Sequence, residues 1–233
     1  MKRYVLCLVF FAAYAAQEDL INKVFLFPKE TATAHVILKP EPSKPLGKFT
    51  VCLRSYTELT REHYLFSLAT AGKDNTFYIG LIPPNLCIIS INQEDKHFKV
   101  DAEVLDWKHT CVSWDSDSGV IQLWVNGKVY LRKVSNKGFT IPSPASIILG
   151  QEQDSYGGHF DAGQSFVGEM CDVHMWDYEL TPEDIKNVQA NDKHGNVLSW
   201  KSLSYEIKGD VLVLPKLQCK SLGYTASLYS LCY

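Results

Sequence analysis

The sequence lacks several patterns that would point to particular classes of protein. No C-x-x-C pair occurs in its 233 residues, so the paired cysteine spacing typical of structural zinc sites is missing. No G-x-S-x-G occurs either, which argues against the nucleophile elbow of an α/β-hydrolase. Because N-x-S/T sequons are also missing, we expect no N-linked glycan.

Positive charge is in slight deficit. The chain has 23 Lys and Arg against 26 Asp and Glu, a formal net charge of −3. A mildly acidic protein is a poor candidate for general binding to nucleic acid or to anionic membranes. It is better suited to binding cations, and we expect no nucleic-acid specificity.

Long apolar runs are missing beyond the N-terminus. Lys2 and Arg3 precede an apolar stretch from Tyr4 to Tyr14, and Ala13-Tyr14-Ala15 resembles an A-x-A cleavage site. This arrangement predicts a secretory signal peptide over residues 1–16, and the run is too short for a transmembrane helix of about 20 residues. We therefore expect a secreted, extracellular protein without a membrane span.

Short runs of β-branched and aromatic residues, broken by Gly, Pro, Asn and Asp, dominate the chain. Phe49, Val51 and Leu53 alternate with Thr50 and Cys52, as expected of a strand with one buried face. Ten such runs predict an all-β fold, a two-sheet antiparallel jelly-roll (lectin-like) sandwich. They are Val24–Phe27, Phe49–Ser55, Tyr64–Leu68, Phe77–Leu81, Leu86–Ile91, Thr110–Trp114, Val120–Val125, Ile147–Leu149, Val173–Trp176 and Val211–Leu214.

One segment, "LTPEDIKNVQAN", departs from the strand pattern. Thr181 suits an N-cap and Pro182 suits the first helical position, while Leu180 can form a hydrophobic staple with Ile185. The segment predicts one short helix on one face of the sandwich.

The stretch from Gly150 to Glu169 combines acids and amides with turn-forming glycines and contains no Lys or Arg. A solvated surface turn would explain such a stretch if it stood alone. However, carboxylates, amide oxygens and main-chain carbonyls are also the ligands that calcium prefers. Together with the Asp74-Asn75 pair, this stretch supplies a full set of oxygen ligands. Its acids and amides are Glu152, Asp154, Asp161, Gln151, Gln153 and Gln164.

A second motif, "HTCVSWDS" from His109 to Ser116, matches the pentraxin signature His-x-Cys-x-Ser-Trp-x-Ser at every fixed position. "KVFLFPKE", "FTVCLRSY", "GKDN", "ILGQEQDSYGG", "QSFVGE", "MWDYELTPEDI", "LSWKSLSYEIKG" and "LPKL" add to this match, in order. The chain therefore resembles the short pentraxins. The resemblance implies a pentraxin domain over residues 17–217 and leaves residues 218–233 as a C-terminal tail extension.

The resemblance implies a flattened jelly-roll protomer with the helix on one face and a double calcium site on the other. It also implies a homopentamer and a non-enzymatic role in innate immunity of the acute-phase type. Such proteins bind phosphocholine, phosphoethanolamine or acidic carbohydrates through calcium, and engage complement components from the opposite face.

By residue-by-residue match, the resemblance assigns two Ca²⁺ ions to each protomer. Both ions would share Glu152 and Asp154. The first ion would add Asp74, Asn75 and the main-chain carbonyl of Gln153. The second ion would add Asp161 and Gln164.

The pocket beside the calcium site is less well defined. Phosphocholine-binding pentraxins carry an aromatic residue where this chain has Gly80, which makes a phosphomonoester or an acidic sugar an equal alternative. Phe77 and Tyr78 are nearby and should point to opposite faces of a strand. The acid that would meet an ammonium group is Asp95 or its neighbour Glu94, in a segment expected to be a loop.

Six of the seven cysteines remain after removal of Cys7 with the signal peptide. An even number in an oxidising compartment favours disulfides, and the resemblance implies a Cys52–Cys111 bond. The other four allow three pairings, of which we favour Cys219–Cys232 with Cys87–Cys171. Bonding between chains is the alternative.

Two other functions fit parts of the pattern. Glu152-x-Asp154 on a strand resembles the carboxylate pair of a jelly-roll glycoside hydrolase, but Tyr156 and Gly157 stand where such an enzyme wants a third glutamate. A structural oligomer, in which calcium only stabilises the loop, is the other alternative.

Overall fold

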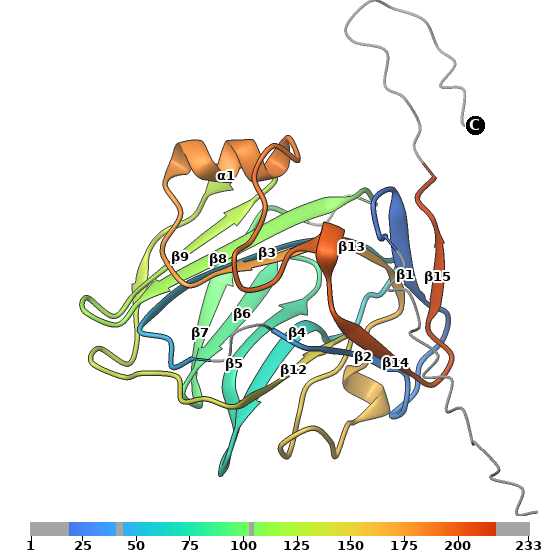
Figure 1. Cartoon of the computed structure of the whole chain (residues 1–233), viewed down its shortest axis with the longest axis horizontal. Helices are drawn as coiled ribbons and strands as arrows, with labels where there is room; N and C mark the ends of the chain where they lie inside the picture. The colour runs from blue at the N-terminus through green and yellow to red at the C-terminus, as the bar shows by residue number, and fades with distance from the viewer. Residues whose placement is uncertain (1–18, 41–43, 103–104, 218–233) are drawn as a thin grey trace, which may run out of the picture.

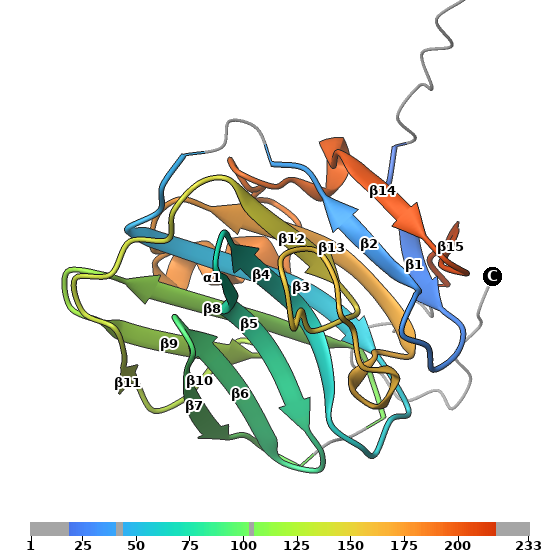
Figure 2. The same cartoon turned by 90° about the horizontal axis from the view of Figure 1, so that it is seen from below.

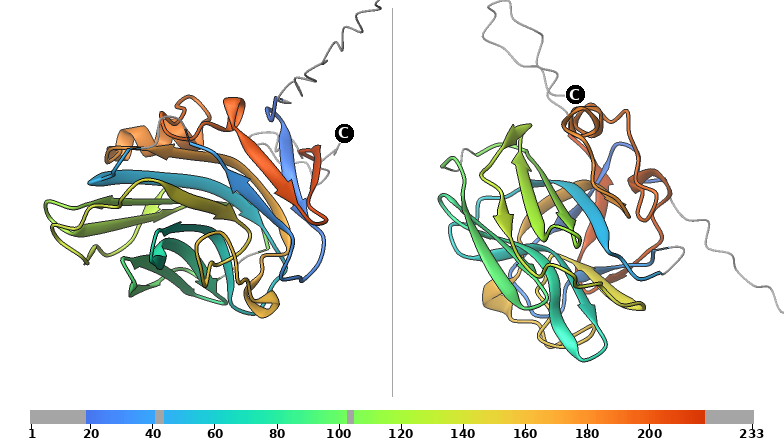
Figure 3. Two further views of the ribbon diagram at one scale, coloured as in Figure 1. Left: turned by 60° about the horizontal axis from the view of Figure 1, so that its bottom comes forward. Right: turned by 90° about the vertical axis from the view of Figure 1, so that its left-hand side faces the viewer.

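The computed structural model describes residues 19–40, 44–102 and 105–217. The predicted signal peptide and C-terminal extension, with Cys219 and Cys232, lie outside these ranges. Two antiparallel sheets pack face to face, and a short helix covers the outer face of one of them (Figures 1 and 3). The predicted jelly-roll class is therefore confirmed.

The larger sheet carries the helix, and the smaller sheet forms the opposite layer. The eight-stranded sheet runs in the order β10 (Lys128–Val129), β9 (Val120–Val125), β8 (Lys108–Asp115), β3 (Lys48–Tyr56), β13 (Gly168–Trp176), β1 (Lys23–Phe27) and β15 (Leu212–Pro215), with β11 (Lys133–Val134) also paired to β9. The seven-stranded sheet runs β14 (Tyr205–Lys208), β2 (His35–Leu38), β12 (Ala145–Leu149), β4 (His63–Thr70), β5 (Lys73–Ile82), β6 (Leu86–Ile91) and β7 (Glu94–Lys99).

All ten predicted runs coincide with strands, although some boundaries shift. Five strands lie outside these runs: the two-residue strands β10 and β11, and the longer strands β2, β7 and β14. β7 and β14 form the two edges of the seven-stranded sheet, and β2 lies next to β14. In β7, "EDKHFK", Phe98 alone is buried. Edge strands have one neighbour and often carry charge that blocks further pairing. Their apolar pattern is therefore too weak to identify a strand.

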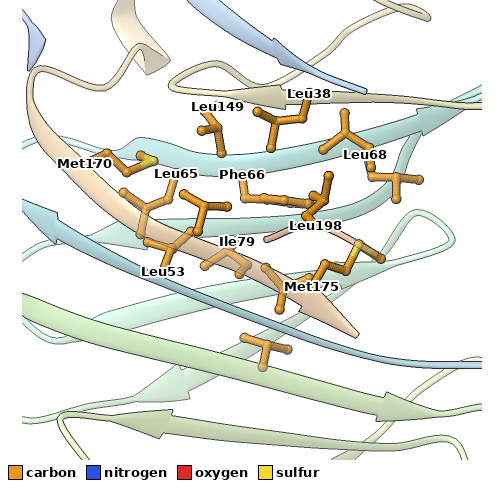
Figure 4. Packing of buried hydrophobic residues seen from close by; sticks show 14 of the residues in the cluster. Leu38, Leu53, Leu65, Phe66, Leu68, Ile79, Leu149, Met170, Met175 and Leu198 are labelled. Carbon is orange, nitrogen blue, oxygen red and sulfur yellow. The ribbon is translucent and has the colours of Figure 1, made fainter. Parts of the chain in front are cut away.

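The core lies between the two sheets and is built from their inward-facing side chains. Figure 4 shows leucines from β3 and β4 with Ile79 of β5 and Met175 of β13 in one continuous layer. Phe49 joins this layer through contacts between ring centroids of 4.6 Å to Phe77 and 5.8 Å to Trp114. The layer fixes the register of both sheets, because a slip of one residue would turn every core side chain outward.

Helix α1 (Pro182–Gln189) lies on the outer face of the eight-stranded sheet (Figure 1). The Thr181 hydroxyl accepts from the Asp184 N–H at 3.1 Å, and the Asp184 carboxylate accepts from the Thr181 N–H at 3.1 Å. This capping box satisfies two of the four free donors at the helix N-terminus. Leu180 and Ile185 pack in one buried cluster, as the staple predicts.

The Cys52–Cys111 disulfide joins residues that face each other on β3 and β8. It lies in the same buried cluster as the helix residues Ile185 and Val188. Closing a loop of 59 residues stabilises the fold by about 4 kcal/mol on the chain-entropy model. The predicted bond is confirmed.

The favoured pairing of Cys87 with Cys171 is wrong. Both cysteines are buried free thiols. Cys87 lies on β6 of the seven-stranded sheet, whereas Cys171 lies on β13 of the other sheet. Core side chains fill the space between the two sheets, and each cysteine behaves as a small apolar residue there. Burial raises the pKa of both thiols to about 12, which keeps them protonated and unreactive at neutral pH.

Thiol labelling tests this assignment. In the native protein, we expect an alkylating agent to leave Cys87 and Cys171 unmodified. After unfolding without reductant, both should be labelled, while Cys52 and Cys111 should need reduction first. Peptide mass spectrometry distinguishes the four sites. A Cys87–Cys171 peptide pair in the unreduced digest would contradict the structure.

Candidate metal centre

The acidic stretch forms a loop between β12 and β13, here called the acidic loop (residues 150–167). Figure 1 shows it beyond the seven-stranded sheet, on the side away from α1, and Figure 2 shows it in front of that sheet. The helix and the acidic loop therefore occupy opposite faces of the sandwich, as the resemblance implies.

The base of the acidic loop is closed by a close approach of two chain segments. Gly150 has a φ of +84°, and a Cβ at this position would lie 2.3 Å from the ring of Phe27. Only glycine fits both conditions. The Gly150 carbonyl accepts from the Phe166 N–H at 2.9 Å, and the Gly150 N–H donates to the Leu65 carbonyl at 3.1 Å. These contacts hold the two ends of the loop together.

Two buried amides anchor the loop from within. Gln151 Nε2 donates to the carbonyl of Thr31 at 2.7 Å. Gln153 Nε2 donates to Ser67 Oγ at 3.1 Å, and its Oε1 accepts from the Gly157 N–H at 2.9 Å. The side chain of Gln153 is therefore committed to the protein interior. This arrangement agrees with the prediction that its main-chain carbonyl, and not its amide, serves as a ligand.

Glu152 lies between these amides, and its side chain is only 4% exposed. Burial raises its pKa to about 7, and the negative charges of Asp154, Asp74 and Asp95 add to the effect. A hydrogen bond from Asn75 opposes this increase. The acidic loop and the start of β5 thus bring four of the predicted ligands, Asp74, Asn75, Glu152 and Asp154, into one electrostatic neighbourhood.

Asp74 and Asn75 are held at the start of β5, next to the β6–β7 turn. Asp74 Oδ1 accepts from the Asn75 N–H at 2.8 Å and from Gln93 Nε2 at 3.0 Å. Lys73 donates to the side chain of Asn92 and is therefore directed toward that turn. Lys73 therefore does not compete with a cation for the remaining side-chain oxygens of Asp74 and Asn75.

Asp161 and Gln164 lie on a one-turn 3₁₀ helix, η1 (Ala162–Gln164), further along the acidic loop. Asp161 caps it, accepting from the Gly163 N–H at 2.8 Å. Arg61, just before β4, donates to the carbonyls of Gly163 at 2.9 Å and Ser165 at 2.8 Å. Arg61 therefore fixes the position of this turn, a role that the sequence did not predict.

The predicted ligands include three buried oxygens that lack a hydrogen-bond partner in the described part of the chain. They are Asn75 Oδ1, Glu152 Oε1 and Gln164 Oε1. A buried polar atom without a partner costs about 1–3 kcal/mol. An oxygen-seeking divalent cation would satisfy these atoms. The donor set is all oxygen, so the residues present fit calcium.

The predicted ligand pocket is altered by the structure. Phe77 is fully buried between the sheets and packs against Phe49 and Phe66. It therefore offers no surface to a ligand, and its predicted place in the pocket is wrong. Tyr78 points to the outer face, and its hydroxyl donates to Asp95 Oδ1 at 2.7 Å.

Asp95, and not Glu94, is the acid that adjoins the site. It lies on strand β7 instead of the expected loop, and its side chain is exposed. Glu94 points elsewhere, because its Oε2 accepts from Ser135 Oγ at 2.6 Å and from Asn136 Nδ2 at 3.0 Å. The turn before β7 has positive φ angles at Asn92 and Gln93, which suits a two-residue hairpin.

Two further residues on this side of the sheet, Tyr64 and its partner Glu62, were not predicted from the sequence. The Tyr64 ring of β4 stacks edge-to-face on Tyr78 with centroids 5.0 Å apart. The Tyr64 hydroxyl donates to Glu62 Oε1 at 2.5 Å. Gly80 was the sequence signal that could have pointed to Tyr64. It pairs with Tyr64 across β4 and β5, and it has no side chain to fill the space beside that ring.

Within residues 19–40, 44–102 and 105–217, one group of three His, Cys, Asp or Glu side chains brings its ligand atoms close together, and it is not the predicted calcium set. Cys52, His109 and Cys111 place one ligand atom each within 4.8 Å of one another, but the two sulfurs are bonded to each other. The His109 ring contacts Cys111 Sγ at 3.6 Å. Burial lowers its pKa to about 4, so the ring is neutral and has a structural role.

None of the helices in the described ranges is long and apolar enough to cross a membrane.

Comparison with known proteins places these features in a family. The pentaxin (pentraxin) family model matches residues 23–215. The chain is 56% identical to C-reactive protein of Xenopus laevis over 100% of both chains. It is 44% identical to serum amyloid P-component of Mus musculus, over 86% of this chain and 90% of the relative.

A solved structure shares the fold. The native heptameric SAP-like pentraxin from Limulus polyphemus superposes with a TM-score of 0.77 at 26% identity, covering 84% of this chain and 96% of the Limulus chain.

These similarities support a pattern-recognition protein of innate immunity and confirm the prediction that the protein is not an enzyme. The match covers both faces of the sandwich, including the signature on β8 and the acidic loop. The chain belongs to the pentaxin family.

Proposed function

We propose that the protein is a secreted, calcium-dependent pattern-recognition protein that holds two Ca²⁺ ions per protomer on the face of the acidic loop. The observation that carries the proposal is a set of three buried oxygens that have no hydrogen-bond partner among the described residues: Asn75 Oδ1, Glu152 Oε1 and Gln164 Oε1. Secretion follows from the signal peptide that the sequence predicts over residues 1–16.

Charge explains how such a site would take an anion. When all four are ionised, the carboxylates of Asp74, Glu152, Asp154 and Asp161 carry four negative charges, and two calcium ions would balance them. Calcium accepts six to eight oxygen ligands, so positions remain for an oxyanion of the ligand. The ions themselves would attract that group. We expect calcium affinity typical of extracellular modules, about 10⁻⁴–10⁻³ M.

The ligand class is an exposed phosphomonoester, such as phosphocholine or phosphoethanolamine, or an acidic carbohydrate. The Asp95 carboxylate and the Tyr78 ring lie beside the calcium ligands, where they would contact the group attached to the phosphate. The resemblance also implies contact with complement components on the face that carries α1.

An apolar stripe on the surface, outside the core, supports assembly as a homopentamer. Val129, Leu131 and Val134 lie along the strand segments β10 and β11 and the link between them, with Leu131 84% exposed. Exposed apolar residues grouped in this way mark interaction surfaces. The Limulus pentraxin is heptameric, and we propose a closed ring of five subunits for this chain.

Retention on an affinity resin tests the function. In millimolar calcium, the full-length secreted protein should bind phosphoethanolamine resin and elute with chelator, because calcium bridges protein and phosphate. Underivatised resin is the control. If calcium raises the thermal stability of the protein but no anionic resin retains it, the structural alternative replaces recognition.

The charge of Glu152 predicts a pH dependence of stability. The folded protein holds this proton up to about pH 7, whereas the unfolded chain releases it near pH 4.5. With chelator present, the stabilisation of the fold by protonated Glu152 is therefore complete below about pH 4.5 and is lost as the pH rises to about 7. Glu152→Gln should stabilise the calcium-free protein at pH 8 by on the order of 1–3 kcal/mol and remove most stabilisation by calcium.

Urea unfolding with and without calcium measures both effects. Asp192→Asn makes the same charge change at an exposed position on the opposite face and should alter neither. Equal behaviour of the two variants would show that Glu152 is not a calcium ligand.

Assembly can be tested at the apolar stripe. Leu131→Asp should give a monomer in sedimentation or light scattering, because a charge would be buried at the subunit contact. Leu212→Asp, at another exposed leucine, serves as the control and should leave the ring intact. A fully assembled Leu131→Asp protein would place the subunit contact elsewhere.

A further inference from the structure

A pocket of about 240 Å³ opens beside β13, on the face of the eight-stranded sheet that also carries α1. Its walls come from the start of the described chain, from β13, from the loop after α1 with its 3₁₀ helix η2 (Trp200–Ser202), and from the residue that follows β15. The residues that matter here are Ile21, Asp172, His174, Trp200, Lys201 and Lys216.

An irregularity in β13 directs an acid into this pocket. The register between β13 and β3 shifts between Cys171 and His174, and Asp172 has a φ of 53° at this point. A positive φ is uncommon for a residue other than glycine, and a bulge often redirects a side chain. Here Cys171 stays in the core between the sheets, whereas Asp172 lines the pocket.

Cations outnumber this acid. Asp172 Oδ2 lies 3.0 Å from Arg54 Nε and 3.0 Å from Lys216 Nζ. These three side chains are only 14–18% exposed. Lys201 is exposed and adds a further positive charge to the lining. Three cations against one acid leave two positive charges in excess, which favours an anion in the pocket.

His174 supplies a directed hydrogen-bond donor. The residue is 4% exposed, and its Nδ1 accepts from the main-chain N–H groups of Gly195 at 3.4 Å and Trp200 at 3.3 Å. Burial lowers its pKa to about 4, so the ring is neutral at pH 7 and carries its hydrogen on Nε2.

The Nε2–H of His174 has no acceptor among the residues that the structure describes. Because Nδ1 faces the main chain, the opposite edge of the ring, with Nε2–H, is the edge left for the pocket. A buried donor without a partner is unfavourable. A ligand oxygen in the pocket would satisfy it.

The lining limits both the size and the charge of such a ligand. The volume is below the range of about 300–1,000 Å³ typical of drug-sized ligands, and Ile21 and Trp200 give the pocket an apolar side. The charge of Asp172 repels a dianion twice as strongly as a monoanion. A carboxylate has one charge and two acceptor oxygens, which matches the donors of His174 and Lys201.

We propose that this pocket is a calcium-independent binding site for small organic monocarboxylates. The carboxylate accepts from His174 Nε2 and from the Lys201 ammonium, and the apolar part of the ligand lies against Ile21 and Trp200. The inference is independent of the proposed function, because none of these residues belongs to the acidic loop or to β5.

Calorimetry on the full-length secreted protein in calcium-free buffer tests the inference, with benzoate, benzamide and sulfate as probes. Benzoate should bind. Benzamide has the same ring without the charge and should bind at least about tenfold more weakly, because hydrogen bonds to a charged group are the stronger ones. Sulfate is a dianion and should also bind more weakly than benzoate. Added calcium should leave the benzoate affinity unchanged.

Asp172→Asn should change the preference among anions. Asparagine tolerates a positive φ and keeps an oxygen for Arg54 and Lys216. Loss of the negative charge should raise the affinity for sulfate at least about fivefold more than the affinity for benzoate.

Lys201→Met changes an exposed side chain and should lower the benzoate affinity about threefold, as expected for an exposed ion pair. Lys186→Met makes the same change at an exposed position of α1 outside the pocket. It is the matched control and should leave the benzoate affinity unchanged.

Three results would overturn the inference. Benzoate could fail to bind or bind only with calcium, which would place the probe at the acidic loop. Benzamide could bind as tightly as benzoate. Asp172→Asn and Lys201→Met could alter binding no more than Lys186→Met does. None of these results affects calcium-dependent retention on phosphoethanolamine resin, so the proposed function stands or fails separately.

Discussion

The burial of Glu152 is the constraint on which the face of the acidic loop depends. A carboxylate almost without solvent contact, close to three other acids, is unfavourable in the ionised form. Its neighbours supply one hydrogen bond, from Asn75, and no lysine or arginine. The fold keeps this charge in place because buried amides and a glycine at the base hold the loop rigidly on either side. The ionised form of Glu152 is thus unfavourable when only protein groups surround it, and a divalent cation bound there would stabilise that form.

The opposite face is organised by a different principle. There the disulfide between β3 and β8 and the residues of α1 form one apolar cluster, and Arg54 of β3 donates to the carbonyl of Gln189 at the helix C-terminus. Three partly buried charges on this side pair with one another, since Arg54 and Lys216 both contact Asp172 at 3.0 Å. The two faces therefore differ: on the face with α1 the partly buried charges have partners, whereas the face of the acidic loop has buried oxygens that lack a hydrogen-bond partner among the described residues.

Sequence reasoning predicted the features that depend on local chemistry. The helix was identified because Thr181, Pro182 and Leu180 each have a defined role at a helix start, and the central strands because their apolar residues alternate. The edge strands were not predicted, because residues on an edge strand, such as Asp95, need little apolar surface. The false Cys87–Cys171 pairing arose because counting cysteines carries no information on which sheet each strand joins. Tyr64 and Arg61 were missed for the same reason, since their roles come from contacts across strands and loops.

The closed base of the acidic loop has a consequence for how recognition is coupled to the rest of the molecule. Gly150 and Phe166 meet at the sheet surface, so the 15 residues between them form a compartment with its own hydrogen bonds. Ordering or loosening this compartment need not shift β12 or β13, whose positions are set by the core. If the proposed function holds, the ion supply would therefore control ligand binding at the acidic loop without a change in the scaffold.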